Sequence, residues 1–317
     1  SESDSEDPLS PTASSETIDI PSPSATLGQV LENATGVEIR RNGSMGRGES
    51  VQLIGALGHQ VQFVLDEMPL LVTRGQSVDL STFPMGMFKR VRVTRGGASV
   101  DYGSGALGGV IHMESDLASR TRSRVYVRSG SFGYHALGVN VPFMKGKNGL
   151  LVGGQYEESL GNFSFQDGNL RNRTRDNNHH HKGNVSAVGQ WYTSDIGRLK
   201  LFVDLFADRR GEPGPMEFPN LTAESERRRL LLGTQLRLNP QFSGRVVHNL
   251  EVFTQIRQFT FRDPNPIFVG DPQFFQMNDL SRSTRLRSQI QLTPVLMLRT
   301  GFGATLDQIG TRKREKV

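Results

Sequence analysis

The densest group of side chains able to hold a metal or move a proton is His179, His180 and His181, together with Glu157 and Glu158. A metal site needs about three or four ligands that converge on one point. Neighbouring residues of a strand point to opposite faces, so neither group is expected to converge. We therefore expect the histidines to end an exposed loop where a strand begins. The alternative is weak capture of a metal or metal complex on the outer surface.

Two further patterns bear on enzyme chemistry. Glu157 and Glu158 form a poor general acid/base pair if they face opposite sides of a strand. The sequence has no G-x-S-x-G, H-E-x-x-H or Walker motif, and it has no cysteine. We predict that the chain is not an enzyme, and that it has no resident metal and no cofactor.

The stretch Arg95 to Ser115 contains six glycines, at positions 96, 97, 103, 105, 108 and 109. A glycine-rich turn between a strand and a helix can cradle phosphate. Here the G-x-x-x-x-G-K-[ST] pattern and a following helix are both missing. We therefore expect the glycines to serve tight turns and close packing of the backbone.

Composition narrows the class of protein. The 317 residues are 35% hydrophobic, with no run near the ~18 apolar residues of a membrane helix. Membrane-spanning strands give a much weaker signal, because only alternate residues face lipid. The formal charge of +5 raises nucleic-acid binding as an alternative. We predict no nucleic-acid partner, because Lys and Arg are scattered singly.

Residues 116–317 show alternating polar and apolar residues, which predicts strands with one apolar face. In Arg198 to Asp208, one face carries Leu199, Leu201, Val203, Leu205 and Ala207. The opposite face carries Lys200, Asp204 and Asp208, along with Phe202 and Phe206. The segments Arg285 to Thr293 and Leu298 to Asp307 show the same alternation. A soluble β-sandwich would alternate in the same way.

The connections favour an outer-membrane barrel. Short turns are expected at Gly146 to Asn148, Ser194 to Gly197, Asn239 to Gly244 and near Pro294. Long polar loops are expected at Leu160 to His181, Arg209 to Glu226 and Arg262 to Arg282. Strict alternation of short and long connections is typical of transmembrane barrels with strands of ~9–11 residues. We predict about nine strands, with Trp191 and Tyr192 either in an aromatic girdle or in a core aromatic pair.

The sequence pattern of residues 25–115 predicts a small α/β domain. Thr26 and Gln29 form a capping box, and Gly36 can end the helix that follows. Short strands are expected at Val37 to Arg41, Val51 to Ile54 and Val61 to Asp66.

Three passages of this domain carry a family resemblance: VQFVLDEMPL, DLSTFPMGMFKRVRVTRGG and YGSGALGGV. They occur in the order found in the plug domain of TonB-dependent outer-membrane receptors, and the plug is most similar to that of the cobalamin transporters. The resemblance implies an α/β plug at 25–115, followed by antiparallel transmembrane β-barrel strands at 116–317. Residues 1–24, rich in Ser, Pro and acidic residues, are expected to be disordered.

The resemblance also implies a coupling peptide and a ligand site. Glu16, Thr17, Ile18, Asp19 and Ile20 resemble the TonB box, which would bind a TonB-type periplasmic partner by strand addition. An ordinary linker is the alternative. The ligand-facing plug loops would contain Asn42, Ser44, Arg47, Thr73, Arg74 and Gln76. Arg47 and Arg74 would bind an anionic ligand or stand as solvated loop charges.

The chain departs from the family in two places. Gly55 follows Ile54 where family plugs carry arginine, so Arg95 is left as the expected lock between plug and barrel. Only about six residues separate Ile20 from Leu27, so the coupling peptide is expected to have a short tether.

Nine strands are too few to close around a plug, because plugged receptors have about 22. We therefore expect the sequence to be an N-terminal portion or one half of a split receptor. The expected location is the outer membrane of a Gram-negative bacterium, with the signal peptide already removed.

The function implied is TonB-dependent import of a ferric siderophore, cobalamin or another scarce nutrient. The alternative is a non-transporting, receptor-like scaffold component of an outer-membrane assembly. A soluble periplasmic β protein is a third interpretation.

Overall fold

In the computed structural model, the described residues are 14–20, 22, 25–41, 48–66, 68–70, 78–96, 106–117, 122–166, 168, 171–193, 196–240, 246–267, 272–292 and 297–313. The chain divides into two compact units. The first comprises Ser1–Asn42 and Arg47–Asp116, and the second comprises Gly43–Gly46 and Leu117–Val317.

The first unit is built on a five-stranded mixed sheet with the order β1-β6-β7-β4-β5. Its strands are β1 (Ser14–Asp19), β4 (Val61–Leu65), β5 (Met68–Pro69), β6 (Phe88–Arg95) and β7 (Gly109–Ser115). A hairpin of β2 (Val37–Arg41) and β3 (Glu49–Leu53) forms a separate small sheet. Fully buried Leu27, Leu53, Phe63, Met85 and Ile111 belong to the core of this unit.

Short helices complete the first unit: α1 (Leu27–Leu31), η1 (Gly58–Gln60), η2 (Leu80–Thr82) and η3 (Met85–Met87). The predicted capping box is confirmed, because the Gln29 amide donates to Thr26 Oγ1 and the Thr26 amide donates to Gln29 Oε1. The prediction for Gly36 is wrong. The helix ends at Leu31 with a right-handed Glu32, and Gly36 (φ +71°) forms the turn into β2.

The N-terminal segment is more ordered than its composition predicts. Ser14–Asp19 form β1 and pair antiparallel with β6 along their whole length. Thr17 and Ile18 are β-prone, and β6 offers the segment a hydrogen-bonding edge. The expected disorder of 1–24 is therefore wrong for these six residues.

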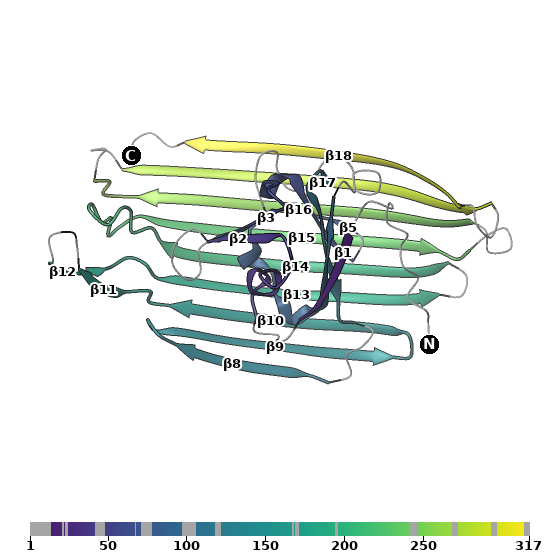
Figure 1. The fold of residues 1–317 in the computed structure, drawn as a ribbon, viewed down its shortest axis with the longest axis horizontal. Helices are drawn as coiled ribbons and strands as arrows, with labels where there is room; N and C mark the ends of the chain where they lie inside the picture. The colour runs from purple at the N-terminus through teal and green to yellow at the C-terminus, as the bar shows by residue number, and fades with distance from the viewer. Residues whose placement is uncertain are drawn as a thin grey trace. The chain divides into compact units, whose positions relative to one another are not determined.

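The second unit contains a nine-stranded antiparallel sheet in which sequence neighbours pair, apart from one inserted hairpin (Figure 1). Its strands are β8 (Arg124–Gly130), β9 (Tyr134–Lys145), β10 (Asn148–Ser159), β13 (His180–Thr193), β14 (Gly197–Gly211), β15 (Glu224–Leu238), β16 (Val246–Asp263), β17 (Gln273–Gln291) and β18 (Met297–Lys313). The inserted hairpin is β11 (Phe163–Gln166) and β12 (Asn172–Arg175). The predicted fold class, a small α/β domain followed by about nine antiparallel strands, is confirmed.

The predicted alternation is confirmed on β14. Leu205 is 51% exposed on one face, whereas Asp204 is fully buried on the other. We call the face that carries Leu205 the apolar face and the face that carries Asp204 the polar face. On the polar side, the strands bring together charged side chains from neighbouring elements.

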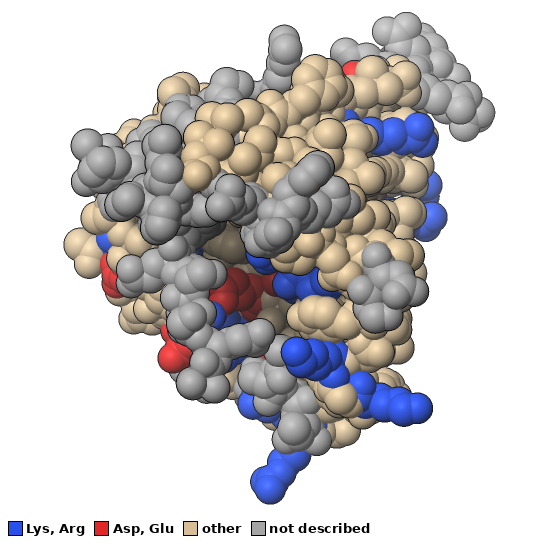
Figure 2. Space-filling model, turned by 90° about the vertical axis from the view of Figure 1, so that its right-hand side faces the viewer, with Lys and Arg blue, Asp and Glu red and all other residues tan. Residues whose placement is uncertain are grey.

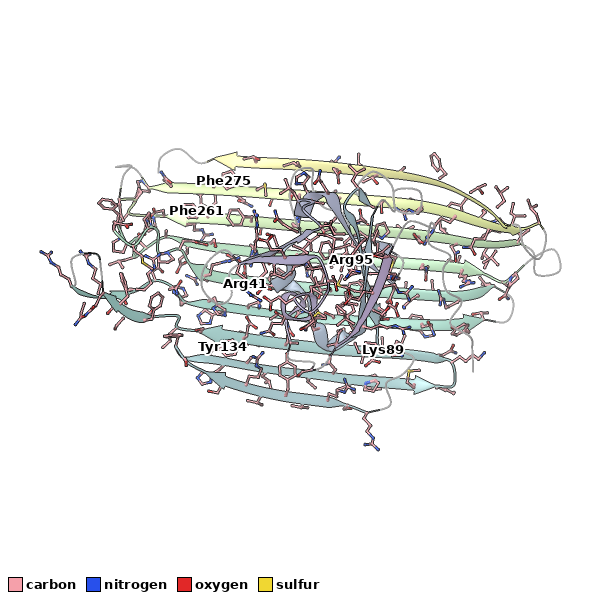
Figure 3. The ribbon with its side chains drawn as sticks, viewed as in Figure 1. Arg41, Lys89, Arg95, Tyr134, Phe261 and Phe275 are labelled. Atoms are coloured by element: carbon pink, nitrogen blue, oxygen red, sulfur yellow. The ribbon has the colours of Figure 1, made fainter. Side chains whose placement is uncertain are left out.

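The long loops are shorter than predicted, because the strands continue into them. Arg209 pairs with Glu226, and Arg210 pairs with Ser225, inside what the sequence predicts as a loop. β17 has 19 residues, about 60 Å at ~3.3 Å per residue. At the same end, the directly opposed Phe261 and Phe275 lie on β16 and β17 (Figure 3).

The other end of the strands carries the short turns. Lys145, Lys147 and Arg237 are exposed there, and Lys and Arg side chains are visible at several places in Figure 2, which views this end. Trp191 and Tyr192 lie near the end of β13 and are 37% and 44% exposed. Among the described residues, no helix is long and apolar enough to cross a membrane.

Candidate functional site

The segment predicted to be a coupling peptide, Glu16 to Ile20, lies at the edge of the first unit's sheet. The Ile20 amide donates to the Lys89 carbonyl at 3.1 Å, which identifies a hydrogen-bonded pair. Antiparallel pairing alternates, so the even-numbered residues of β1 direct their backbone groups to β6. Thr17 and Asp19 direct theirs to the opposite edge, where the sheet order places no described strand.

Arg95 holds β1 against the rest of the unit (Figure 3). Its Nη2 forms an ion pair with the Glu16 carboxylate, and its Nε donates to the Thr35 carbonyl at 2.7 Å. The Thr35 amide donates to Glu16 Oε2 at 3.1 Å. These contacts, with Arg95 as the largest cause, lower the pKa of the Glu16 carboxyl below its usual value of 4.5.

The role predicted for Arg95, a lock between plug and barrel, stays a prediction. The contacts just described join Arg95 to residues of its own unit. The sequence did not point to Glu16 as its partner, because 79 positions separate the two residues. Their diagonal placement across β1 and β6 follows only from the register, in which Ser14 faces Arg95.

Six residues predicted for the ligand-facing loops lie outside the described residues: Asn42, Ser44, Arg47, Thr73, Arg74 and Gln76. The bases of both loops are described. Arg41 precedes the first loop and forms ion pairs with Glu49, which follows it, and with Glu32. The second loop ends just before Asp79.

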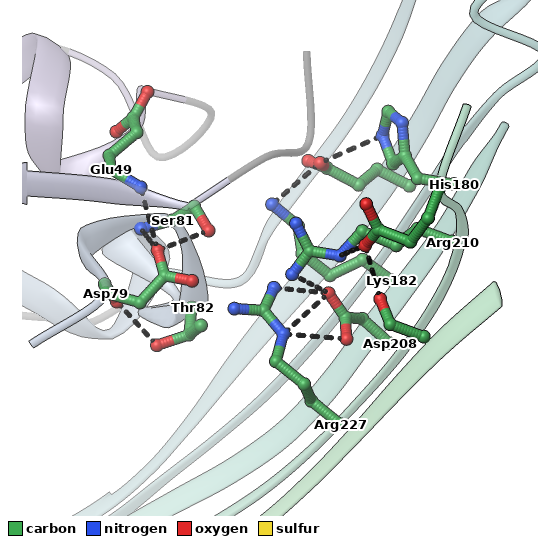
Figure 4. A network of polar contacts seen from close by, with 12 residues as sticks. Glu49, Asp79, Ser81, Thr82, His180, Lys182, Asp208, Arg210 and Arg227 are labelled. Carbon is green, nitrogen blue, oxygen red and sulfur yellow. Dashed lines mark hydrogen bonds and ion pairs between the residues drawn. The ribbon is translucent and has the colours of Figure 1, made fainter. Parts of the chain in front are cut away.

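Asp79 joins the bases of these two loops (Figure 4). Its Oδ1 accepts hydrogen bonds from the Glu49 amide at 3.1 Å and from the Ser81 amide at 3.0 Å. The Ser81 hydroxyl donates to the same oxygen at 2.7 Å. The described residues that follow segments 42–47 and 71–77 are therefore in contact, although 30 positions separate Glu49 from Asp79. Asp79 was missed by sequence reasoning, which treated the two loops independently.

The polar face of the second unit carries a chain of ion pairs. Asp208 accepts from Arg227 Nε at 2.9 Å and lies 3.2 Å from Arg210 Nη2 (Figure 4). Asp204 accepts from Arg229 Nη2 at 2.8 Å and from the Ser186 hydroxyl at 2.6 Å. Further along the sheet, Arg257 pairs with Asp279, and Arg287 pairs with Glu251.

The glutamates predicted to diverge do so. Glu157 lies 2.7 Å from Lys182 Nζ and 3.5 Å from His180 Nε2. Glu158 instead accepts a hydrogen bond from the Tyr156 hydroxyl, with His181 nearby on the apolar face.

These contacts define what the second unit can do chemically. Asp204, Asp208 and Glu157 each form an ion pair with a cationic neighbour. Within the described part of the chain, no three His, Asp or Glu side chains are placed to hold a metal ion together. The face is suited to holding strands in register and presenting paired charges.

Comparisons with known proteins agree on one family. A family model described as the TonB-dependent receptor plug domain matches residues 8–110. The vitamin B12 transporter BtuB of Vibrio cholerae is 30% identical over 149 residues, which is 46% of this chain and 23% of the transporter. The chain therefore spans about a quarter of the length of that curated relative.

Solved structures show the same fold. The copper transporter OprC superposes with a TM-score of 0.73 at 17% identity, over 94% of this chain and 46% of OprC. The pyoverdine receptor FpvA of Pseudomonas aeruginosa gives a TM-score of 0.67 at 14% identity, over 91% of this chain and 44% of FpvA. In each case, the match covers under half of the receptor.

Proposed function

The chain belongs to the TonB-dependent outer-membrane receptors, and we propose that it serves the energy-coupled uptake of a scarce nutrient through the outer membrane. The observation that carries this proposal is the position of Glu16 to Ile20. A short β-prone peptide lies at a sheet edge, with the backbone groups of Thr17 and Asp19 directed away from β6. A partner strand can add to such an edge through backbone hydrogen bonds.

The mechanism follows from two states of this segment. In the docked state, Glu16 is bound to Arg95 and Thr35, and β1 is paired with β6. A periplasmic TonB-type protein that pulls on β1 would work against these contacts. Ligand binding favours release only if the ligand binds the undocked plug more tightly than the docked plug.

The ligand would bind at segments 42–47 and 71–77. Glu49 and Asp79, which follow these two segments in the sequence, are joined by a hydrogen bond, and this contact supports treating the segments as one candidate site. Arg47 and Arg74 are the side chains suited to an anionic ligand, by paired charge-assisted hydrogen bonds. Ferric siderophores and cobalamin are the ligand classes proposed, in line with the receptors that the chain resembles.

The test uses the full-length receptor in its native outer membrane. Deleting Thr17 to Ile20 should abolish uptake of radiolabelled cobalamin or of a panel of labelled ferric siderophores, while surface binding of the same probe persists. Replacing both Arg47 and Arg74 with Gln should weaken surface binding. Uptake that survives the deletion would contradict the coupling role. An absence of probe uptake in the unaltered protein, with normal assembly, would favour the non-transporting scaffold.

A further inference from the structure

Two of the three adjacent histidines lie together at the end of β13 where the long connections lie. The rings of His179 and His181 have their centroids 5.9 Å apart. We propose that His179 and His181 form a surface site for a divalent transition-metal ion, Cu²⁺ above all. Neither histidine belongs to the coupling segment or to the loops proposed to bind the nutrient.

The strand explains why these two residues form a pair. Residues at positions i and i+2 of a strand point to the same face. His181 pairs with Glu158 on β10 and with Arg209 on β14, and it shares the apolar face with both. His179 comes one residue before β13, and its Nε2 lies 4.0 Å from Glu224 at the start of β15. Residues of three strands therefore surround the two rings.

The neighbours of His181 can orient its ring. The Tyr156 hydroxyl lies 3.1 Å from His181 Nδ1, and Glu158 Oε2 lies 3.5 Å from the same nitrogen. Metal-binding histidines usually have the second ring nitrogen engaged by a carboxylate or another polar group. With Nδ1 engaged in this way, Nε2 is the nitrogen available to a metal.

Both rings are accessible from solvent. The side chain of His181 is 48% exposed, and that of His179 is 30% exposed. His180 differs, because its side chain is 4% exposed and lies 3.5 Å from Glu157 on the polar face. The three histidines therefore divide into an accessible pair and one that faces the other way.

The chemistry favours a particular class of ion. Two imidazoles do not make the closed set of three or four ligands of a structural site, and no third ligand is in place among the described residues. Water, or Glu158 or Glu224 after a change of rotamer, would complete the coordination. A planar set of nitrogen and oxygen ligands suits Cu²⁺, which also binds more tightly than the other first-row divalent ions.

One neighbour opposes metal binding. Arg209 lies directly opposite His181. The Nη2 of Arg209 donates a hydrogen bond to Glu224 Oε2 at a distance of 2.6 Å. Its charge repels a cation at the pair, and its hydrogen bonds occupy the nearest carboxylate of His179. Replacing Arg209 with Gln should therefore raise the affinity for Cu²⁺.

The experiment is a Cu²⁺ titration of the full-length protein in detergent. Binding is measured by calorimetry, and the ligand set is measured by electron paramagnetic resonance. We expect one site with two nitrogen ligands. His179→Ala and His181→Ala should each lower the affinity at least about tenfold, a loss that even outer-shell partners of a metal site cause. His248→Ala, far along the sheet on β16, should leave it unchanged.

The matched control is His180, which lies between the pair in sequence. His180→Gln should leave Cu²⁺ affinity unchanged, and His180→Asn serves as a second variant if the first fails to assemble. An equal loss of affinity in the His180 variant would overturn the proposal, because it would indicate a flexible tri-histidine segment. Equal affinity in the unaltered protein and in the His179 and His181 variants would overturn it as well. The readout is metal binding, so either result leaves the proposed uptake function untouched.

Discussion

At the residue scale, the contact between Arg95 and Glu16 ties the N-terminal strand to the rest of the plug. Arg95→Gln removes the ion pair and leaves the backbone pairing of β1 with β6. We expect faster amide hydrogen exchange in Ser14–Asp19, because local opening of this edge strand becomes easier. Exchange in β4 should not change. Arg40→Gln, which removes an exposed pair with Glu38, is the matched control. Unchanged exchange in β1 would contradict a holding role for Arg95.

We expect the same contact to make docking of β1 dependent on pH. The pKa of Glu16 is lowered in the docked state, chiefly by the hydrogen bond from Arg95. A lowered pKa in the folded state stabilises docking above the ordinary value of 4.5, and this contribution is lost as the pH falls through the lowered pKa. Hydrogen exchange or a spin label on β1, followed from pH 7 downward, should report release below about pH 4.5.

The Arg95→Gln variant provides the control for this pH dependence. Arg95 is the main cause of the lowered pKa of Glu16, so this lowering should largely disappear in the variant. The release of β1 should then depend little on pH. If the variant and the unaltered protein release β1 with the same pH profile, another group controls docking.

We expect Asp204 to contribute strongly to the stability of the barrel strands. It is 1% exposed and accepts hydrogen bonds from Arg229 and Ser186. Asp204→Ala should lower the free energy of unfolding by roughly 3–5 kcal/mol, because a buried pair loses one partner. Urea unfolding in detergent measures this. The exposed pair of Arg228 and Glu226 is the control, since Glu226→Gln should cost about 1 kcal/mol or less.

At the element scale, the register of β1 assigns docking to β6 and addition of a partner strand to different residues of β1. Ile18 directs its backbone groups to β6, and Thr17 directs its own to the open edge. Ile18→Pro should undock β1, because proline removes a donor from the ladder. Thr17→Pro should keep β1 docked but block a partner strand. We expect Thr17→Pro to abolish binding of a soluble TonB-type domain while exchange protection in β1 persists. Equal binding by both variants would rule out strand addition at this edge.

The elements also show how far the sequence predicts the structure. Capping by Thr26 and Gln29 is local chemistry, so it was predictable, and so was the alternation of Leu205 with Asp204. The ends of the long strands were not. Arg209 and Glu226 are charged residues typical of a loop, and only their pairing across β14 and β15 makes them strand residues. Asp79 was missed for a similar reason, because its partner Glu49 is distant in sequence.

At the scale of the whole molecule, the two faces of the nine-stranded sheet are expected to meet different surroundings. Leu232 on β15 and Val203 on β14 are directly opposed on the apolar face. Glu226 and Arg209 pair on the same face, six residues along each strand. At ~3.3 Å per residue this is about 20 Å, so one face passes from an apolar band to a charged row. An outer-membrane barrel has such a band on its lipid side.

Charges introduced at two depths test this orientation. Leu232→Lys places a charge in the apolar band, where it should cost about 2–4 kcal/mol in a bilayer. Gln258→Lys places the same charge near the charged row, beside Asn278, where the cost should be about 0–1 kcal/mol. In the full-length receptor, Leu232→Lys should reduce the fraction that assembles in the outer membrane, and Gln258→Lys should assemble normally. Equal assembly of both variants would indicate that this face does not meet lipid, which would favour a soluble β protein.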